Sequence, residues 1–317
     1  MACCCGCIIC ILGIITLSKL LIQLGTIVYQ QFIQKPTDLK KFGAKEGSWA
    51  LITGASDGIG RQFANEFGKA GFNLLLVSRT KSKLDDVAKD IESKYPDIKT
   101  QVIAIDFSNA TETDYKNLES VCENLDVSVL VNNVGTNHSF PTPFAEEKPE
   151  LLEAICTVNN TTAVKITRML LPKMIANKKG LVLNMGSFSG MLPTPLLTTY
   201  SSTKAFLITW TKCLASELEG TGVHVQLFNT YFVTTNMSKI RRATALIPTA
   251  EDYVKSAMKA IGKTHVSAPY LTHALAEFAI NLCPEPIAVM INHNMNKNTR
   301  VRALRKQERL AKEAKKQ

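Results

Sequence analysis

A glycine-rich turn near residue 54 constrains the fold of this chain more than any other sequence feature. The apolar run 49–53 leads into the turn, and Ile59, Phe63 and Phe67 then recur at helical spacing. Glycine permits a tight turn, close approach of the backbone to a phosphate, and close packing of a helix on a strand. In this strand–turn–helix context we expect a diphosphate-binding loop, with a purely structural turn as the alternative. The predicted loop reads Thr53-Gly54-Ala55-Ser56-Asp57-Gly58-Ile59-Gly60.

Further short apolar runs follow along the chain and alternate with helical patterns. A run such as Leu74-Leu75-Leu76-Val77 is apolar throughout, as expected for a strand of a parallel sheet that is buried on both faces. This alternation predicts an α/β fold, a doubly wound parallel sheet (Rossmann fold), in one domain spanning residues 47–290. The predicted strands are Trp49–Thr53, Asn73–Ser78, Thr100–Ile105, Val127–Asn132, Leu181–Met185 and Val223–Phe228.

Residues 1–34 are strongly apolar, with Ser18 and Lys19 as the main interruption. About 20 apolar residues cross a bilayer as a helix, so we expect a membrane anchor. A cleaved signal peptide is disfavoured because no basic region precedes the apolar run, and a buried core helix is the other alternative. Four lysines occur in the predicted linker, residues 35–46, and none precedes the anchor. By the positive-inside rule, the rest of the chain is then expected in the cytoplasm.

The formal net charge of +10 is unevenly distributed along the chain. Residues 300–317 hold eight Lys or Arg against two Glu, so the remainder has little net charge. A nucleic-acid-binding protein ordinarily carries a basic patch on its folded domain as well, and no nucleic-acid partner is expected here. We interpret residues 291–317 as a basic C-terminal tail, either solvated or lying on anionic lipid.

The cysteines argue against both disulfides and a metal site. Of nine cysteines, five precede residue 11 and the other four are isolated, which indicates reduced thiols. The N-terminal cysteines are either small apolar residues of the anchor or sites of palmitoylation. Neither they nor His265 and His273 have the spacing of metal ligands, so no metal is expected. Both histidines are interpreted as structural or exposed.

The glycine loop resembles the Thr-Gly-x-x-x-Gly-x-Gly loop of the short-chain dehydrogenase/reductase family. The similarity runs from about residue 47 to residue 286 and includes Asn132-Asn133-Val134-Gly135. It implies an oxidoreductase that binds a nicotinamide dinucleotide. Thr230-Tyr231 stands where the family usually has Pro-Gly, which puts the shape of that loop in question. The cofactor-binding residues implied are Gly54, Ser56, Asp57, Gly58, Ile59, Gly60, Asp106, Asn133, Gly135, Val233 and Thr235, together with Tyr200 and Lys204.

The end of the second predicted strand bears on which dinucleotide is bound. An NAD enzyme is expected to place an acidic residue there for the ribose 2′-hydroxyl. This chain has Arg79 instead, and a guanidinium suits a 2′-phosphate. We therefore expect NADPH, with a solvated helix start as the alternative role for Arg79.

Tyr200 and Lys204 are four residues apart and share one face of a predicted helix. A nearby ammonium stabilises a phenolate, which makes a tyrosine usable in acid–base chemistry near neutral pH. Ser187 lies thirteen residues earlier at a strand end, where its hydroxyl could hold a carbonyl oxygen. A surface pair on a helix is the alternative for Tyr200 and Lys204 alone. The family resemblance adds Asn159, which is chosen over its neighbour Asn160 by spacing, as the residue that holds a proton-relaying water.

Three longer matches resemble the endoplasmic-reticulum very-long-chain 3-oxoacyl-CoA reductases, also called type 12 17-beta-hydroxysteroid dehydrogenases. These matches are Gly186–Leu197, Met237–Arg242 and Met295–Arg300. The resemblance implies reduction of 3-oxoacyl-CoA in fatty-acid elongation at the endoplasmic-reticulum membrane, possible elongation partners, and an acyl-CoA substrate that contacts Ser187 and Tyr200.

The basic residues Lys239, Arg241 and Arg242 are candidates for binding the phosphates of CoA, with a solvated basic helix as the alternative. Two other functions stay open from the sequence. One is a steroid or retinoid reductase with the same catalytic residues, for which these basic residues would matter little. The other is a catalytically silent scaffold at a lipid surface, although the intact Ser187, Tyr200 and Lys204 argue against it.

Overall fold

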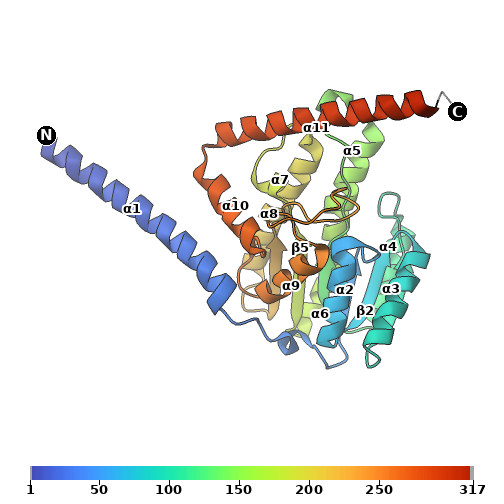
Figure 1. Ribbon diagram of the computed structural model, residues 1–317. Helices are drawn as coiled ribbons and strands as arrows, with labels where there is room; N and C mark the ends of the chain where they lie inside the picture. The colour runs from blue at the N-terminus through green and yellow to red at the C-terminus, as the bar shows by residue number, and fades with distance from the viewer. Residues whose placement is uncertain (1, 315–317) are drawn as a thin grey trace.

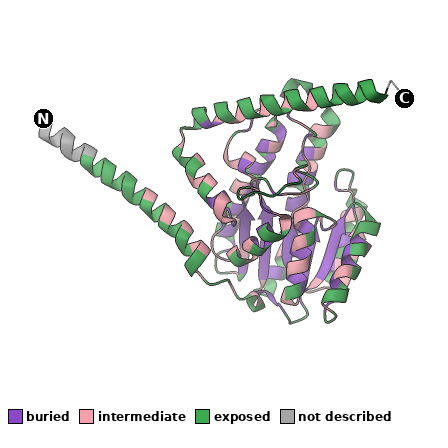
Figure 2. Ribbon diagram, in the orientation of Figure 1, coloured by how far each residue is buried: buried purple, intermediate pink, exposed green. Residues whose placement is uncertain are grey.

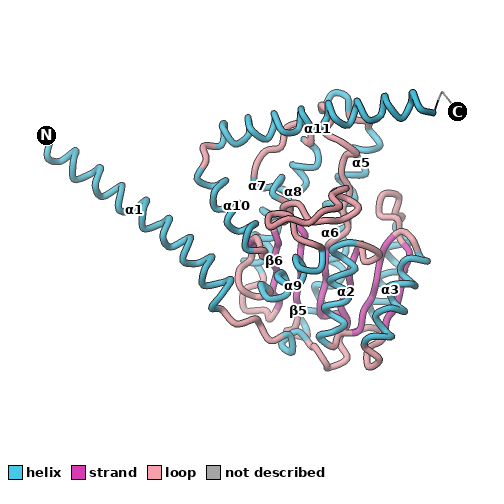
Figure 3. Tube along the Cα trace, viewed as in Figure 1, coloured by secondary structure: helices cyan, strands magenta, loops and turns pink. Residues whose placement is uncertain are grey.

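The computed structural model describes residues 2–314, with side chains described from Cys10 onward. A seven-stranded parallel sheet forms its centre, in the order β3-β2-β1-β4-β5-β6-β7 (Figure 1, Figure 3). All six predicted strands are confirmed, while the two-residue strand β7 carries too little pattern to predict. The strands are β1 Trp49–Thr53, β2 Asn73–Ser78, β3 Thr100–Ala104, β4 Val127–Asn132, β5 Gly180–Met185, β6 Val223–Phe228 and β7 Val266–Ser267.

Helices cover both faces of the sheet, which confirms the doubly wound fold. Alternate strand residues point to opposite faces, so Ile52 packs with the helices α2, α3 and α9 while its neighbour Leu51 packs with α4, α6 and α8. The strands are buried between these layers (Figure 2). The helices are α2 Gly58–Ala70, α3 Lys81–Lys94, α4 Glu112–Glu123, α5 Pro149–Cys156, α6 Thr162–Ala176, α7 Phe188–Met191, α8 Thr198–Glu217, α9 Ala250–Ala260, α10 Leu271–Leu282 and α11 Glu285–Ala314.

The N-terminal helix α1, Ala2–Val28, extends away from the body and continues into a π-helical turn, Tyr29–Ile33 (Figure 1). The span Cys10–Ile33 is long and apolar enough to cross a membrane, and none of its most apolar window is buried. It contacts the body only near its C-terminal end, where Ile27 packs beside α10 and Gln31 donates to the Pro269 carbonyl at 3.0 Å. The side chains of the first four cysteines lie outside the described residues.

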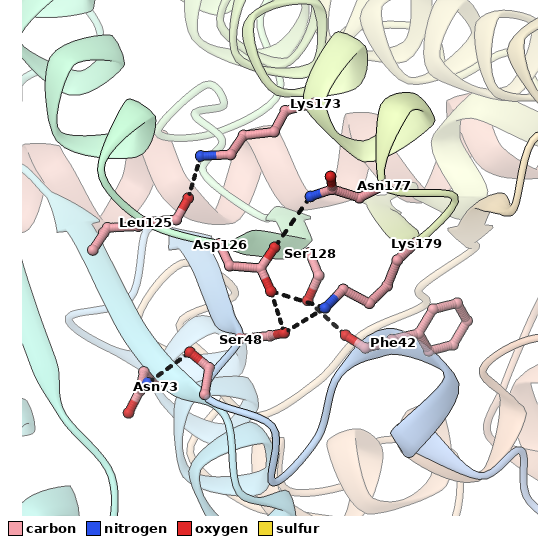
Figure 4. Close-up of polar contacts among 10 residues, drawn as sticks. Phe42, Ser48, Asn73, Leu125, Asp126, Ser128, Lys173, Asn177 and Lys179 are labelled. Carbon is pink, nitrogen blue, oxygen red and sulfur yellow. Dashed lines mark hydrogen bonds and ion pairs between the residues drawn. The ribbon is translucent and has the colours of Figure 1, made fainter.

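The predicted linker is in part a packed element of the domain. Phe42 and Ala44 are buried, and a 3₁₀ turn, Leu39–Phe42, ends at Gly43 in the left-handed region. Ser128 donates to the Phe42 carbonyl at 2.6 Å, beside an ion pair of 2.8 Å between Lys179 and Asp126 (Figure 4). Apolar burial and these bonds therefore tie Phe42 and Ala44 to the amino end of the sheet, while the boundary between residues 46 and 47 stays a prediction.

The boundary predicted between residues 290 and 291 also falls inside one element, the 30-residue helix α11 (Figure 1). Its N-terminal half is packed rather than a free tail. Asn292, Asn296 and Arg300 lie four residues apart on one face, which is turned to the body. Asn292 donates to Thr194 Oγ1 at 3.1 Å, Asn296 to the Pro195 carbonyl at 2.8 Å, and Arg300 to the Pro141 carbonyl at 3.1 Å. The helix thus bridges two loops at the carboxyl end of the sheet.

Candidate active site

The predicted glycine loop lies at the carboxyl end of β1 and turns directly into α2. Gly54 has a φ of 68°, and a Cβ placed on it would lie 2.9 Å from Asn133 Nδ2. A Cβ on Gly60 would collide with the Gly54 carbonyl. The Asn133 amide itself donates to the Thr53 carbonyl at 2.9 Å. Asn133, expected to bind the cofactor, has its side chain bonded to the backbone of the loop, so its contribution is to the loop's shape.

The geometry of this loop fits a diphosphate. The first turn of α2 presents backbone N–H groups at a helix N-terminus, where partial positive charge gathers. Asp57 caps that turn, accepting from Gly58 N at 2.7 Å and from Asn236 Nδ2 at 2.5 Å. Ser56 Oγ lies 2.8 Å from Ser78 Oγ, which ties the loop to β2, and Ile59 packs against the core.

The remaining predicted cofactor residues gather along the same edge of the sheet. Arg79 is exposed at the end of β2. Asp106 follows β3, and its carboxylate accepts from Ser108 N at 3.1 Å, so one of its oxygens holds its own turn. Val233 is buried in the core. Thr235 approaches the glycine loop, since a Cβ on Gly58 would lie 3.2 Å from its methyl group.

Ser187 and Tyr200 are brought together from different elements. Ser187 follows β5 and caps the short helix α7, accepting from Ser189 N at 3.2 Å. Tyr200 lies in the first turn of α8, and its phenol is close to the Ser187 side chain. Burial raises the pKa of the Tyr200 phenol, and the neighbouring Ser187 side chain lowers it in part. The resting phenol is therefore protonated and can act as a proton donor.

Lys204 lies one turn farther along α8, with 6% of its surface exposed. Its ammonium donates to the Met185 carbonyl at 2.8 Å and lies 5.8 Å from the centre of the Tyr200 ring. Burial lowers the pKa of Lys204 to about 8. A positive charge is thus held beside the phenol in a poorly solvated place, where it acts strongly on a developing phenolate.

Asn159 lies in a π-helical turn, Thr157–Thr161, between α5 and α6. Its side chain accepts from Thr136 N at 2.8 Å and donates to Thr203 Oγ1 at 3.0 Å. The amide of Asn160 points instead at the carbonyl of Thr203. Gly135 passes close by, since a Cβ on it would lie 3.4 Å from Asn159 Oδ1 and 3.9 Å from Lys204 Nζ. Of the two neighbours, Asn159 is the one that faces the Gly135 backbone near Lys204.

The sequence matches the family model for short chain dehydrogenases over residues 48–245. The chain belongs to the short chain dehydrogenase family. It is therefore an oxidoreductase, and its cofactor class is NAD(P). The family assignment confirms the resemblance on which several of the residue predictions rest.

The curated relatives of this short chain dehydrogenase include two fungal proteins named very-long-chain 3-oxoacyl-CoA reductase. The protein of Phaeosphaeria nodorum is 43% identical over 311 residues, covering 95% of this chain and 91% of the relative. The protein of Aspergillus niger is 45% identical over 288 residues, covering 88% and 83%.

Two similar solved structures support the fold. One, from a study of 7beta-hydroxysteroid dehydrogenase stereoselectivity, has a TM-score of 0.71 at 25% identity and covers 80% of this chain and 98% of its own. The other is a short-chain dehydrogenase from Sphingobium yanoikuyae in complex with NADPH. It has a TM-score of 0.66 at 25% identity and covers 74% of this chain and 92% of its own.

In this short chain dehydrogenase, the predicted basic substrate residues lie in an irregular segment between β6 and α9. The segment is not helical, and whether its basic residues bind substrate or are simply solvated stays open. Arg241 and Arg242 are exposed, whereas Lys239 donates to the Ser139 carbonyl at 3.0 Å. Lys239 thus joins this segment to the loop after β4.

The replacement of Pro-Gly by Thr230-Tyr231 creates an aromatic cluster behind Ser187. The Tyr231 ring lies 5.2 Å from Phe188 and 5.9 Å from His273, which is fully buried. Burial lowers the pKa of His273 to about 4, so this histidine is neutral and structural, as expected. Among the side chains that the structure describes, residues 10–314, no group of three or more His, Cys, Asp or Glu is placed to hold a metal ion.

Sequence patterns did not indicate two further polar residues beside the site. His138 and Glu147 form a buried pair of 2.8 Å in the loop after β4. A histidine and a glutamate nine residues apart in a loop have no periodic signal. Their only sequence signal was their place after the Asn132–Gly135 motif, at the carboxyl end of a central strand.

Proposed function

We propose that this chain is a membrane-anchored, NADPH-dependent reductase that converts very-long-chain 3-oxoacyl-CoA to 3-hydroxyacyl-CoA in fatty-acid elongation. The observation that carries the proposal is the convergence of Ser187, Tyr200 and Lys204 beside the glycine loop. Relatives with 41–45% identity over most of the chain carry the name of this activity, which supports the choice of substrate.

Each of the four candidate catalytic side chains has its own role in carbonyl reduction. The nicotinamide, when bound, supplies the hydride. The Ser187 hydroxyl holds the carbonyl oxygen, and the Tyr200 phenol gives its proton to that oxygen as negative charge develops there. The Lys204 ammonium, fixed by the Met185 carbonyl, stabilises the phenolate left behind. By analogy with the family, we assign to Asn159 the role of holding a water molecule that returns protons toward Lys204.

The choice of NADPH rests on Arg79. This residue occupies the end of β2, where an NAD enzyme ordinarily has an acid, and its exposed guanidinium can pair with a 2′-phosphate. The NADPH complex of the Sphingobium yanoikuyae protein is consistent with that choice.

Two structural features support a long-chain thioester as substrate. The apolar helix α1 would hold the enzyme at a membrane, where very long acyl chains reside. The exposed Arg241 and Arg242 would pair with the phosphates of CoA. We assign the protein to the endoplasmic-reticulum membrane, with the catalytic domain in the cytoplasm and other elongation enzymes as candidate partners.

A steroid or retinoid reductase is the second candidate. It is favoured by the structural likeness to the protein of the 7beta-hydroxysteroid dehydrogenase study. A catalytically silent scaffold would have no use for Ser187 and Tyr200 placed side by side with a buried ammonium next to them.

The test is NADPH oxidation by the detergent-solubilised full chain, with a long-chain 3-oxoacyl-CoA and estrone compared at equal concentration. Faster turnover of the thioester supports the proposal. Preference for estrone would assign the protein to steroid reduction. NADPH binding without turnover of either substrate would favour the scaffold.

A further inference from the structure

A buried histidine–glutamate pair lies next to the proposed active site and has no part in the chemistry described above. His138 Nε2 is 2.8 Å from Glu147 Oε1, and the two side chains are 1% and 0% exposed. Both residues belong to the loop between β4 and α5, so the pair closes the two ends of this loop on each other.

The neighbouring Asn137 fixes the orientation of the histidine ring. Its Oδ1 accepts from the backbone N–H of His138 at 2.8 Å, and because a backbone N–H can only donate, the amide orientation is settled. The same oxygen lies 3.1 Å from His138 Nδ1. Nδ1 therefore donates to Asn137, which turns Nε2 toward Glu147.

Glu147 has a second bond that leads to the catalytic helix. Its Oε2 accepts from Thr199 Oγ1 at 2.6 Å, and Thr199 is buried in the first turn of α8, directly before Tyr200. On the other side of Tyr200, Ser201 donates to the Ser189 carbonyl at 2.5 Å. Tyr200 is thus held by bonds from both of its chain neighbours, one to the β4–α5 loop and one to α7.

The two oxygens of Glu147 have different neighbours, and this division gives the pair a geometric role. Oε1 lies 2.8 Å from His138 Nε2, while Oε2 accepts from Thr199. Because both side chains are buried, His138 limits the positions that the Glu147 carboxyl group can adopt. The carboxyl group is thereby kept in place to hold Thr199.

We propose that His138 and Glu147 are positioning residues, which hold the first turn of α8 through Thr199 so that the Tyr200 phenol meets Ser187 and the substrate oxygen. This inference rests on the proposed role of Tyr200 as proton donor. It predicts a defect in the chemical step and not in cofactor binding, because the glycine loop and Arg79 lie on other elements.

The decisive variant is Thr199→Val, which removes one hydroxyl and keeps the side-chain shape. Thr198→Val is the matched control, since Thr198 is the exposed neighbour in the same turn. In the full chain we expect Thr199→Val to lower kcat about tenfold, as misalignment of a reacting group does, with KM for the 3-oxoacyl-CoA and Kd for NADPH nearly unchanged. Thr199→Ser restores the hydroxyl and should restore kcat, and Thr198→Val should match the parent protein.

Glu147→Gln supplies a second test, because a glutamine can still accept from Thr199 with its oxygen while its amide group lies beside His138. It should retain more of kcat than Glu147→Ala. An unchanged kcat in Thr199→Val, or a loss that Thr199→Ser does not repair, would overturn the positioning role. So would an equal loss of NADPH affinity. Tyr200→Phe is measured in parallel: if it remained active, the proposed function itself would fail, independently of the result at Thr199.

Discussion

The Lys204 ammonium donates to the backbone carbonyl of Met185 at 2.8 Å, so the end of strand β5 fixes the position of the charge beside Tyr200. The same strand end leads into Ser187 two residues later. One backbone segment therefore sets the relative positions of the ammonium and of the hydroxyl that faces the phenol. Because Lys204 is also buried, its charge depends on pH within an accessible range.

The pH dependence of reduction follows from the lowered pKa of Lys204. Burial brings it to about 8, so the ammonium is charged below that pH and loses its proton as the pH rises through it. Tyr200 does not deprotonate first, because burial raises the pKa of its phenol. We expect kcat/KM for NADPH, which reports the free enzyme, to fall as the pH increases through about 8. A profile that stays flat well above this pH would contradict the assignment.

Asn159 and Asn160 can be separated by experiment. Asn159→Ala removes bonds to Thr136 and Thr203 on the side of the turn that faces Lys204. We expect kcat to fall at least about tenfold, while Asn160→Ala, whose amide bonds only to backbone carbonyls, changes kcat little. Steady-state kinetics and the unfolding midpoint of both variants provide the comparison. A larger kcat defect in Asn160→Ala would reverse the assignment.

Arg79 should select the phosphorylated cofactor. Its replacement by Ala removes a charge-assisted pair with the 2′-phosphate, which corresponds to an increase in KM for NADPH of about tenfold or more, with KM for NADH unaffected. Lys81→Ala is the control, because Lys81 is already paired with Asp85 at 3.0 Å. Equal effects of Arg79→Ala on both cofactors would show that this residue does not read the 2′-position.

Charge reversal at Arg241 and Arg242 tests the proposed CoA contact. In the double variant with Glu at both positions, KM for a long-chain 3-oxoacyl-CoA should rise about tenfold through lost and reversed phosphate pairing. KM for a small ketone, which has no phosphate, should stay the same. Reversal of Arg305 and Lys306 near the end of α11 changes the net charge equally and serves as the control. Equal effects on thioester and ketone would exclude the contact.

The sequence alone predicted most of the fold because buried parallel strands are apolar along their whole length. The four-residue spacing of Tyr200 and Lys204 predicted that they share one helix face. The glycine loop was also predictable, because its residues are close together in the sequence. The Glu147–Thr199 and Arg300–Pro141 contacts could not be predicted from the sequence, because they join residues that are 52 and 159 positions apart, respectively. The burial of Phe42 inside the predicted linker was not predictable, because it depends on strands that follow Phe42 in the chain. Asn133 was found through its motif, but only the structure shows its amide bonded to the loop.

The central claim is that Tyr200 protonates the oxygen formed when this protein reduces a 3-oxoacyl-CoA. The most direct test follows the 3-hydroxyacyl-CoA product by mass spectrometry, with the parent protein and Tyr200→Phe at saturating NADPH. We expect product from the parent protein and a rate at least about a hundredfold lower from Tyr200→Phe, with the same affinity for NADPH in both. Product formation by Tyr200→Phe at nearly the parent rate, or no 3-hydroxyacyl-CoA from the parent protein, would contradict the account.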